Sequence, residues 1–280
     1  MQTIKQLVPL HSATAMLRQN GTLALVPTMG ALHEGHLTLV REAKARATHV
    51  AVSIFVNPLQ FGANEDLDAY PRHMERDAAL LEAEGVDLLW APDVAEMYPG
   101  GFASNISVSG ISEGLCGAAR PGHFDGVATV VCKLFNQVQP DVALFGEKDW
   151  QQLAVIRRMA RDLDLTRPSA DAIMGVAIVR EADGLAMSSR NAYLSLGQRA
   201  QAAVLPAAMR TAIALIAAGE AAEPALNGLK VAVLEGGFAA VDYVQLCDPA
   251  TLAPTETLPA RLLVAARIGG VRLIDNMAVG

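Results

Sequence analysis

Short apolar runs alternate with longer amphipathic runs through the first 179 residues, and this alternation constrains the fold more than any other feature of the chain. Alternation of this kind is typical of βαβ units that build a parallel sheet. The predicted strands cover residues 22–27, 49–56, 86–90, 141–145 and 173–179. The sequence therefore predicts an α/β fold with a parallel sheet in this part of the chain.

The predicted helices lie between these strands and carry recognisable end signals. Residues 33–47 and 124–137 are amphipathic, while Pro71 suits the first position of a helix and Gly85 suits the position that closes it. A further helix is expected to start near Asp149 and to run to about residue 163. Asp149 and the residue three positions later, Gln152, have the spacing of a capping box.

The pattern changes at about residue 180. A polar loop is followed by an Ala-rich helical stretch at 197–218 and by three strands at 241–247, 261–267 and 271–277. A hairpin-like turn at 268–270 joins the last two strands. We therefore expect two domains, a parallel-sheet domain of residues 1–179 and a smaller α+β domain of residues 180–280.

Composition excludes several classes of protein. A net charge of -7 and a pI near 5.4 argue against nucleic-acid binding, which needs a basic face. No stretch has the pattern of a signal peptide or of a membrane span, so we expect a cytoplasmic protein. Cys116, Cys132 and Cys247 are widely spaced and form no C-x-x-C pair, which favours buried thiols over disulfides or a zinc site.

Polar residues follow several of the predicted strands. His33, Asn57, residues 146–149 and residues 187–190 all come after the end of a strand. Ligands of open parallel sheets bind at the carboxyl ends of the strands. We therefore expect these residues to share one site.

Two histidines stand one helical turn apart where the first predicted strand gives way to a helix. At His33 and His36 the backbone N–H groups and the helix dipole already favour an anion, and Gly35 lets a phosphate approach the backbone. The chain has no P-loop at this position, so a nucleotide such as ATP would be held by imidazoles, helix N-termini and cations. The alternative is that one histidine caps the helix while the other is an exposed surface residue.

Cationic and hydroxyl side chains are the next candidates. Lys148 precedes a predicted helix N-terminus, where a cation is unfavourable unless an anion offsets it. Ser188, Ser189 and Arg190 offer charge-assisted hydrogen bonds to phosphoryl oxygens. The alternatives are a solvated lysine, and turn-forming serines beside a surface arginine.

Three further sets of residues could each have either a binding role or a structural role. Asn57 and Gln60 could bind a hydroxylated substrate or the backbone of their own loop. His73 and Asp77, four residues apart on a helix, could reach one cation or form a surface ion pair. Residues 120–124 could form a mobile cover or only a loop that leads into a helix.

Six blocks of this sequence together resemble the pantoate–β-alanine ligase family over nearly the whole chain. They are PTMGALHEGH at 27–36, FVNPLQF at 55–61, YPR at 70–72, RPGHF at 120–124, FGEKDWQQ at 145–152 and DGLAMSSRN at 183–191. The H-x-G-H element alone is shared with nucleotidylyltransferases and class I aminoacyl-tRNA synthetases. The later blocks, in this order, are specific to the ligases.

The resemblance implies a Rossmann-like domain, a smaller C-terminal domain that closes over the nucleotide, and a homodimer. It implies ATP as a substrate with Mg²⁺, and pantoate and β-alanine as the other substrates. The catalytic residues would be His36, the family's acid, together with His33, Lys148 and Arg190. The ATP-binding residues would be Met29, Gly30, Ala31, Leu32, His33, Glu34, Gly35, His36, Gly146, Glu147, Lys148, Asp149, Val179, Met187, Ser188, Ser189 and Arg190. Pantoate would lie between Gln60 and Gln152 with Asn57 as a further contact, and Asp77 would be the metal position.

The implied reaction is ligation through a pantoyl-adenylate, with release of pyrophosphate and AMP. Two alternatives remain at this point, a nucleotidylyltransferase that transfers AMP to a phosphate ester and a nucleotide-binding protein without turnover. Residues 166–170 make a connection longer than the family pattern, and we expect a surface bulge there.

Overall fold

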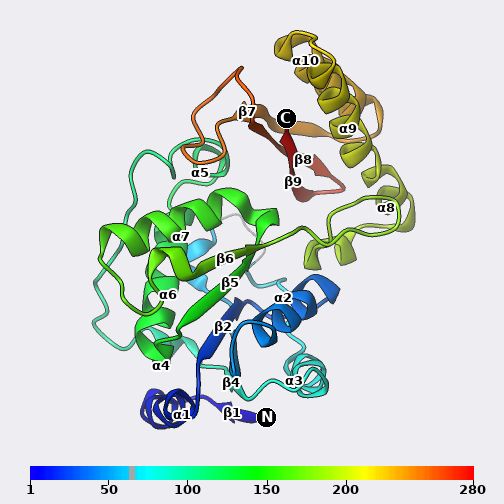
Figure 1. The fold of residues 1–280 in the computed structure, drawn as a ribbon. Coiled ribbons are helices and arrows are strands. Elements are labelled where there is room, and N and C mark those ends of the chain that lie inside the picture. Colours follow the sequence, from blue (N-terminus) through cyan, green and yellow to red (C-terminus); the bar gives the residue numbers. More distant parts are fainter. Residues whose placement is uncertain (63–66) are drawn as a thin grey trace. The chain divides into compact units, whose positions relative to one another are not determined.

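The computed structural model describes residues 1–62 and 67–280, and the chain packs as two compact units (Figure 1). The first unit comprises Met1–Glu147 and Gln152–Ala177, and the second comprises Lys148–Gln151 and Ile178–Gly280. An α/β fold with a smaller α+β part is thereby confirmed. The domain boundary at 179/180 stays a prediction, and the packing differs from it chiefly at residues 148–151, whose contacts place them in the second unit.

A sheet of parallel strands in the order β1-β4-β3-β2-β5-β6 forms the centre of the first unit. The strands are β1 (Gln2–Ile4), β2 (Leu23–Thr28), β3 (His49–Ile54), β4 (Leu88–Trp90), β5 (Val142–Gly146) and β6 (Ile173–Val176). In the register of the central strands, Val26 lies opposite Val52 and Ala24 opposite Val142. These central strands are mostly apolar because both of their faces are covered.

Helices supply that cover. They are α1 (Leu7–Gln19), α2 (Glu34–Lys44), α3 (Met74–Ala83), α4 (Val94–Met97), α5 (Cys116–Ala119), α6 (His123–Val138) and α7 (Trp150–Asp162), with short 3-10 turns η1 (Pro58–Gln60), η2 (Glu147–Asp149) and η3 (Ala170–Ala172). Ala24 and Val26 of β2 pack in one buried cluster with Leu39 of α2 and Leu81 of α3. α1 and α6 also contact β2, so this strand lies at the centre of the core.

The strand order creates a switch point between β2 and β5. The chain runs from β2 to β3 and β4 on one side, and later from β5 to β6 on the other. Adjacent parallel strands that lead away in opposite directions leave a crevice at their carboxyl ends, which is where ligands bind in such sheets. Residues 29–36 follow β2, and Gly146 and Glu147 end β5 and begin η2 at this point.

The predicted boundaries of α3 and β6 are wrong, and β1 and α1 were missed. Helix α3 begins at Met74 and not at Pro71, since the Arg72 guanidinium donates to three carbonyls of the preceding turn, those of Leu67, Asp68 and Tyr70. Strand β6 ends at Val176, three residues before the predicted end. The strand β1 and the helix α1 were not predicted at all, because β1 is only three residues long and α1 has no side-chain cap.

The second unit contains an antiparallel sheet in the order β7-β8-β9, packed on helices. Its elements are η4 (Ser189–Tyr193), α8 (Leu196–Ala202), α9 (Val204–Ala217), α10 (Ala222–Glu235), β7 (Ala240–Cys247), β8 (Ala260–Ile268) and β9 (Val271–Val279). The predicted helix at 197–218 is divided at Ala203, and α10 was missed because Pro224 and Gly228 interrupt its helical pattern. The hairpin between β8 and β9 is confirmed, with Gly269 and Gly270 both at positive φ.

One helical stretch in the described part of the chain, Leu196–Ala217, is long and apolar enough to cross a membrane by length and composition. Its residues Leu205, Met209 and Ala212 are buried in the core of the second unit together with residues of the β7-β8-β9 sheet. That packing is typical of a core helix. The three cysteines are buried as predicted, and burial raises the pKa of the Cys247 thiol to about 11, with a further contribution from Asp248.

The segment at 166–170 is a largely exposed turn that leads through η3 into the amino end of β6. Its Arg167 lies 3.6 Å from Asp141, just before β5. It is therefore a surface turn, as expected, and it lies away from the carboxyl ends of the strands.

Candidate active site

The candidate residues fall into two groups, one in each unit. The first unit holds residues 29–36, Gly146, Glu147 and the predicted pantoate contacts, whereas the second holds Lys148, Asp149, Val179 and residues 187–190.

A tight turn after β2 leads into the histidine pair. Gly30 has φ +82° and Ala31 has φ +52°, so two successive residues adopt the left-handed conformation, which costs free energy for alanine. The buried carboxylate of Asp77, in the first turn of α3, accepts the N–H of Ala31 at 2.7 Å and that of Leu32 at 3.0 Å. Both oxygens of Asp77 are therefore used to hold the backbone of this turn.

His33 and His36 cap helix α2 reciprocally. Nδ1 of His33 accepts the N–H of Gly35 at 3.1 Å, and Nδ1 of His36 accepts the N–H of His33 at 3.3 Å. A nitrogen that accepts carries no proton, so each neutral ring carries its proton on Nε2. The ring centroids lie 4.1 Å apart. Two Nε2–H donors are thus set side by side at a helix N-terminus, where the helix dipole adds to their attraction for an anion.

The structural alternative was that one histidine caps the helix while the other is an exposed surface residue, and only its first part is confirmed. His33 does cap the helix, but His36 is half-buried and joins the same capping arrangement, so it is not an exposed surface residue. Capping uses only Nδ1 of each ring. It is compatible with binding of an anion through Nε2.

Gln60, the predicted pantoate contact, is held firmly after β3. Its Oε1 accepts from Nδ2 of Asn57 at 3.1 Å, and its Nε2 lies 2.9 Å from the sulfur of Met29. Asn57 is only 1% exposed, and its amide also bonds the carbonyl of Gly126 and the hydroxyl of Tyr98. The contacts of Asn57 are those of a residue that orients Gln60, while substrate contact by Asn57 stays a prediction.

Helix α6 supports the same glutamine from the other side. The main-chain carbonyl of Gln60 accepts from Arg120 at 3.2 Å and lies 2.9 Å from Nδ1 of His123. A Cβ on Gly126 would lie 2.2 Å from the carbonyl oxygen of Leu59, so only glycine allows α6 to approach η1 this closely. The motif at 120–124 thus holds the loop that carries Gln60. Its predicted role as a mobile cover stays untested.

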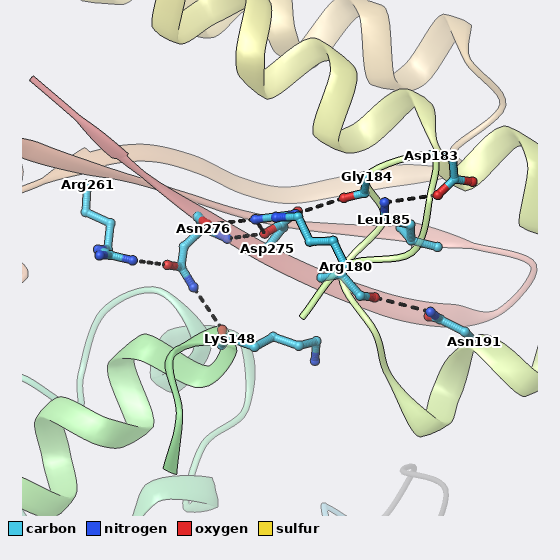
Figure 2. Close-up of polar contacts among 10 residues, drawn as sticks. Lys148, Arg180, Asp183, Gly184, Leu185, Asn191, Arg261, Asp275 and Asn276 are labelled. Carbon is cyan, nitrogen blue, oxygen red and sulfur yellow. Dashed lines mark hydrogen bonds and ion pairs between the residues drawn. The ribbon is translucent and has the colours of Figure 1, made fainter. Parts of the chain in front are cut away.

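In the second unit, the loop after Val179 is folded back on itself and tied to β9 (Figure 2). Arg180 donates to both oxygens of the buried Asp275, at 2.7 and 2.9 Å, and to the carbonyl of Gly184. The hydroxyl of Ser188 caps η4 by accepting the N–H of Arg190. Asn191 donates to Glu181 and to the carbonyl of Ala186. The predicted serine and arginine ligands therefore lie on a turn whose geometry is set by partly buried hydrogen bonds.

Ion pairs stabilise the outer side of this loop. Arg199 of α8 binds Asp183 and Glu181, and its hydrogen bond to Asp183 holds the pKa of that carboxyl below its usual value. Val179 contributes its carbonyl, which accepts the N–H of Met187. Lys148 and Ser188 line one small pocket together with Asn191 and Asp275. The structure thus brings together two of the predicted phosphate ligands, a lysine and a serine.

A metal site receives no support from the described residues. No three side chains of His, Cys, Asp or Glu gather among residues 1–62 and 67–280. Asp77, the predicted metal position, is 1% exposed, and both of its oxygens already accept backbone N–H groups. This carboxylate does not fit a magnesium ligand in the geometry described. We assign no step to a metal.

Several supporting residues were missed from the sequence. Asp275, Asn276 and Arg261 lie in β8 and β9, far from every motif, and no spacing marks them as part of the site. Asp77 was selected as a metal position, which stays a prediction, and its contacts with the backbone of Ala31 and Leu32 were not predicted. The one available signal was a pair of charged or amide residues, Asp275 and Asn276, within a strand that is otherwise mostly apolar.

Comparisons with known proteins show which proteins this chain resembles over its length. Residues 2–278 match the family model described as pantoate-beta-alanine ligase. A pantothenate synthetase of Novosphingobium aromaticivorans is 69% identical, over 100% of this chain and 99% of that protein, and one of Sphingopyxis alaskensis is 60% identical over 100% of both. The solved pantothenate synthetase of Thermus thermophilus has a TM-score of 0.92 and 48% identity over 99% of each chain. A Francisella tularensis enzyme, solved with β-γ ATP and β-alanine, has a TM-score of 0.85 and 32% identity over 99% of this chain and 97% of that one. This chain belongs to the pantoate–β-alanine ligase family.

Proposed function

We propose that this enzyme joins pantoate to β-alanine through a pantoyl-adenylate. The observation that carries the proposal is the pair of Nε2–H donors of His33 and His36, placed at a helix N-terminus beside the switch point of the sheet. The family match and the names of the relatives support the overall reaction, pantothenate synthesis. The Francisella tularensis neighbour was solved with an ATP compound and β-alanine, which supports these two as substrates here.

The reaction proceeds in two steps. A carboxylate oxygen of pantoate attacks the α-phosphorus of ATP, the new P–O bond forms, and the bond to the bridging oxygen breaks to release pyrophosphate. The amine of β-alanine then attacks the acyl carbon, a C–N bond forms, AMP leaves with the C–O electron pair, and the amine loses a proton. No protein nucleophile takes part in either step.

Charge stabilisation is the main contribution of the catalytic residues. His33 and His36 donate from Nε2 to oxygens of the α-phosphate, whose negative charge increases in the transition state. Lys148 and Arg190 add positive charge, and Ser188 and Ser189 donate to phosphate oxygens. Met29 to His36, Gly146, Glu147, Asp149, Val179 and Met187 complete the proposed ATP contacts.

Pantoate is positioned by amide side chains. Gln60 and Gln152 hold its hydroxyl and carboxylate groups and so orient pantoate for in-line attack, which raises the rate. The contacts of Gln60 with Asn57, Arg120 and His123 support this role because they fix the side chain and main chain of Gln60 before substrate arrives.

Three further properties are proposed on the resemblance to the family. Mg²⁺ would accompany ATP and, when bound, would supply positive charge beside the phosphates. The enzyme is a homodimer. It acts in the cytoplasm.

The test is an assay with ATP, pantoate, β-alanine and Mg²⁺ in which each substrate is omitted in turn. We expect AMP only when all three substrates are present. Exchange of labelled pyrophosphate into ATP should require pantoate and not β-alanine, because the adenylate forms before the amine reacts. AMP release without β-alanine at the full rate, or exchange without pantoate, would overturn the mechanism.

A further inference from the structure

The segment that carries Lys148 is held within the second unit by three contacts, one at Lys148 and two at Trp150. Nδ2 of Asn276, in β9, donates to the main-chain carbonyl of Lys148 at 2.9 Å (Figure 2). The guanidinium of Arg261, in β8, stacks on the Trp150 ring with 3.3 Å between Cζ and the ring centroid. Trp150 Nε1 donates to the carbonyl of Pro249 at 3.0 Å. Residues 148–150 come soon after β5 in the sequence, yet these contacts come from β8, β9 and the segment between β7 and β8.

Of these three contacts, the one made by Asn276 involves Lys148 itself. It is 2% exposed, and its Oδ1 accepts from Nη1 of Arg261. This contact fixes which way the amide points, since a flipped amide would turn its NH₂ toward a guanidinium and its oxygen toward the Lys148 carbonyl. The N–H of Asn276 donates to Oδ1 of Asp275, and its main-chain carbonyl accepts from Arg180 at 3.3 Å. The side chain of Asn276 is therefore oriented by Arg261, while Asp275 and Arg180 hold its main chain.

We propose that Asn276 is a positioning residue for adenylate formation. Its hydrogen bond fixes the main chain of Lys148, and the main chain determines where the Lys148 side chain starts. This inference rests on the proposed role of Lys148 at the phosphates. A lysine side chain has four rotatable bonds, so an ordered main chain at its root narrows the space its ammonium samples. A displacement of about 1 Å at a catalytic group can lower the rate by about a hundred-fold.

The substitution Asn276→Asp separates this role from general stability. Aspartate has nearly the same shape and still accepts from Arg261, but it presents an oxygen to the Lys148 carbonyl where asparagine presents a donor. The fold should therefore persist while the bond to Lys148 is lost. Asn276→Ala, which removes both contacts, is the second variant.

The first readout follows the Lys148 carbonyl itself. Lys148–Asp149 is the only Lys–Asp pair in the sequence, so labelling lysine with carbonyl ¹³C and aspartate with ¹⁵N isolates one carbonyl–amide correlation by NMR. A carbonyl carbon that loses a hydrogen bond moves upfield. We expect this shift in both variants, and it does not depend on enzymatic activity.

The second readout is the rate of adenylate formation in a single turnover. We expect Asn276→Asp to lower this rate by about ten- to a hundred-fold with little change in the KM for pantoate, and by less than Lys148→Ala does. Asp242→Asn is the matched control, because Asp242 binds Arg267 and Arg272 on the same sheet and has no described contact with residues 148–150. This control should leave both the carbonyl shift and the rate near those of the parent enzyme.

The outcomes separate the two proposals. An upfield carbonyl shift together with a slower adenylation step supports the inference. A variant with an unchanged carbonyl shift, or with a shifted carbonyl and the parent rate, overturns it. A parent enzyme that forms no AMP from the three substrates contradicts the proposed function instead, and that result is seen before any variant is made.

Discussion

The backbone N–H of His33 donates to Nδ1 of His36 across 3.3 Å. This bond uses Nδ1 of His36 to cap helix α2. Because Nδ1 accepts a hydrogen bond, the proton of the neutral ring lies on Nε2. The same logic applies to His33, which accepts the N–H of Gly35. Nδ1 of each ring therefore has the structural role, and Nε2 is the nitrogen to which we assign the proposed catalytic role.

Variants of His36 should separate these two roles. Asparagine places an acceptor near the position of Nδ1 and has nothing at Nε2, so His36→Asn should keep the cap and lose the donor. We expect adenylate formation to fall by about a hundred- to a thousand-fold, as for the loss of one oxyanion donor. Urea unfolding should show that His36→Ala loses about 1 kcal/mol more stability than His36→Asn.

The same histidine offers a spectroscopic check that needs no substitution. In ¹⁵N-labelled protein at neutral pH, both rings should show the Nε2–H tautomer, with Nδ1 unprotonated. A spectrum in which the His36 proton resides on Nδ1 would contradict the capping geometry.

Asp77 should behave as a structural carboxylate. In Asp77→Asn one oxygen still accepts, while the new NH₂ faces a backbone N–H of the turn at residues 31 and 32. We expect a loss of about 1–3 kcal/mol in the free energy of unfolding and a lower kcat, because the left-handed turn before His33 loses its support. Glu75→Gln, an exposed change in the same helical turn, is the control and should have no effect.

The dependence of activity on Mg²⁺ concentration distinguishes a structural role of Asp77 from metal binding. The activity lost in Asp77→Asn should stay lost at saturating Mg²⁺. Recovery of the parent kcat at high Mg²⁺ would instead make Asp77 a metal ligand.

Gly126 should be needed for the position of Gln60. A Cβ at this residue would lie 2.2 Å from the Leu59 carbonyl oxygen, so Gly126→Ala must push α6 away from η1. We expect a loss of stability of about 1–3 kcal/mol and a raised KM for pantoate, because the displaced loop carries Gln60. Gly228→Ala in α10 meets no atom within 4 Å and should instead stabilise the enzyme by up to about 1 kcal/mol.

Much of the fold could be predicted because its signals are local. The apolar strands β2, β3 and β5 and the amphipathic helix α2 are each recognisable from a window of ten or so residues. The histidine cap was also accessible, since His33 and His36 lie within one turn. Boundaries that depend on distant or side-chain contacts were not, as at Met74, where the bonds of Arg72 delay the start of α3.

The supporting residues of the site could not be predicted for a related reason. Asp77 binds backbone N–H groups 45 and 46 residues earlier, and Asn276 binds a carbonyl 128 residues earlier. A contact with main-chain atoms imposes no pattern on the partner's side chain, so nothing in the sequence pairs Asn276 with Lys148. The motif residues that we propose to touch substrate groups were found through their patterns and through resemblance, whereas the residues that contact them emerge only from packing.

Acid stability should depend on Asp242. Burial alone would raise the pKa of this carboxyl, but hydrogen bonds from Arg267 and Arg272 outweigh burial and leave the pKa below its usual value. A folded-state pKa below the unfolded value of about 3.9 means that the ion pairs stabilise the folded state fully above that pH, and that their contribution is lost as pH falls from about 4 through the lower folded value. In Asp242→Asn, the free energy of unfolding measured in urea should be lower at neutral pH and should fall less steeply below pH 4. Equal slopes in the two proteins would show that these ion pairs do not stabilise the C-terminal sheet.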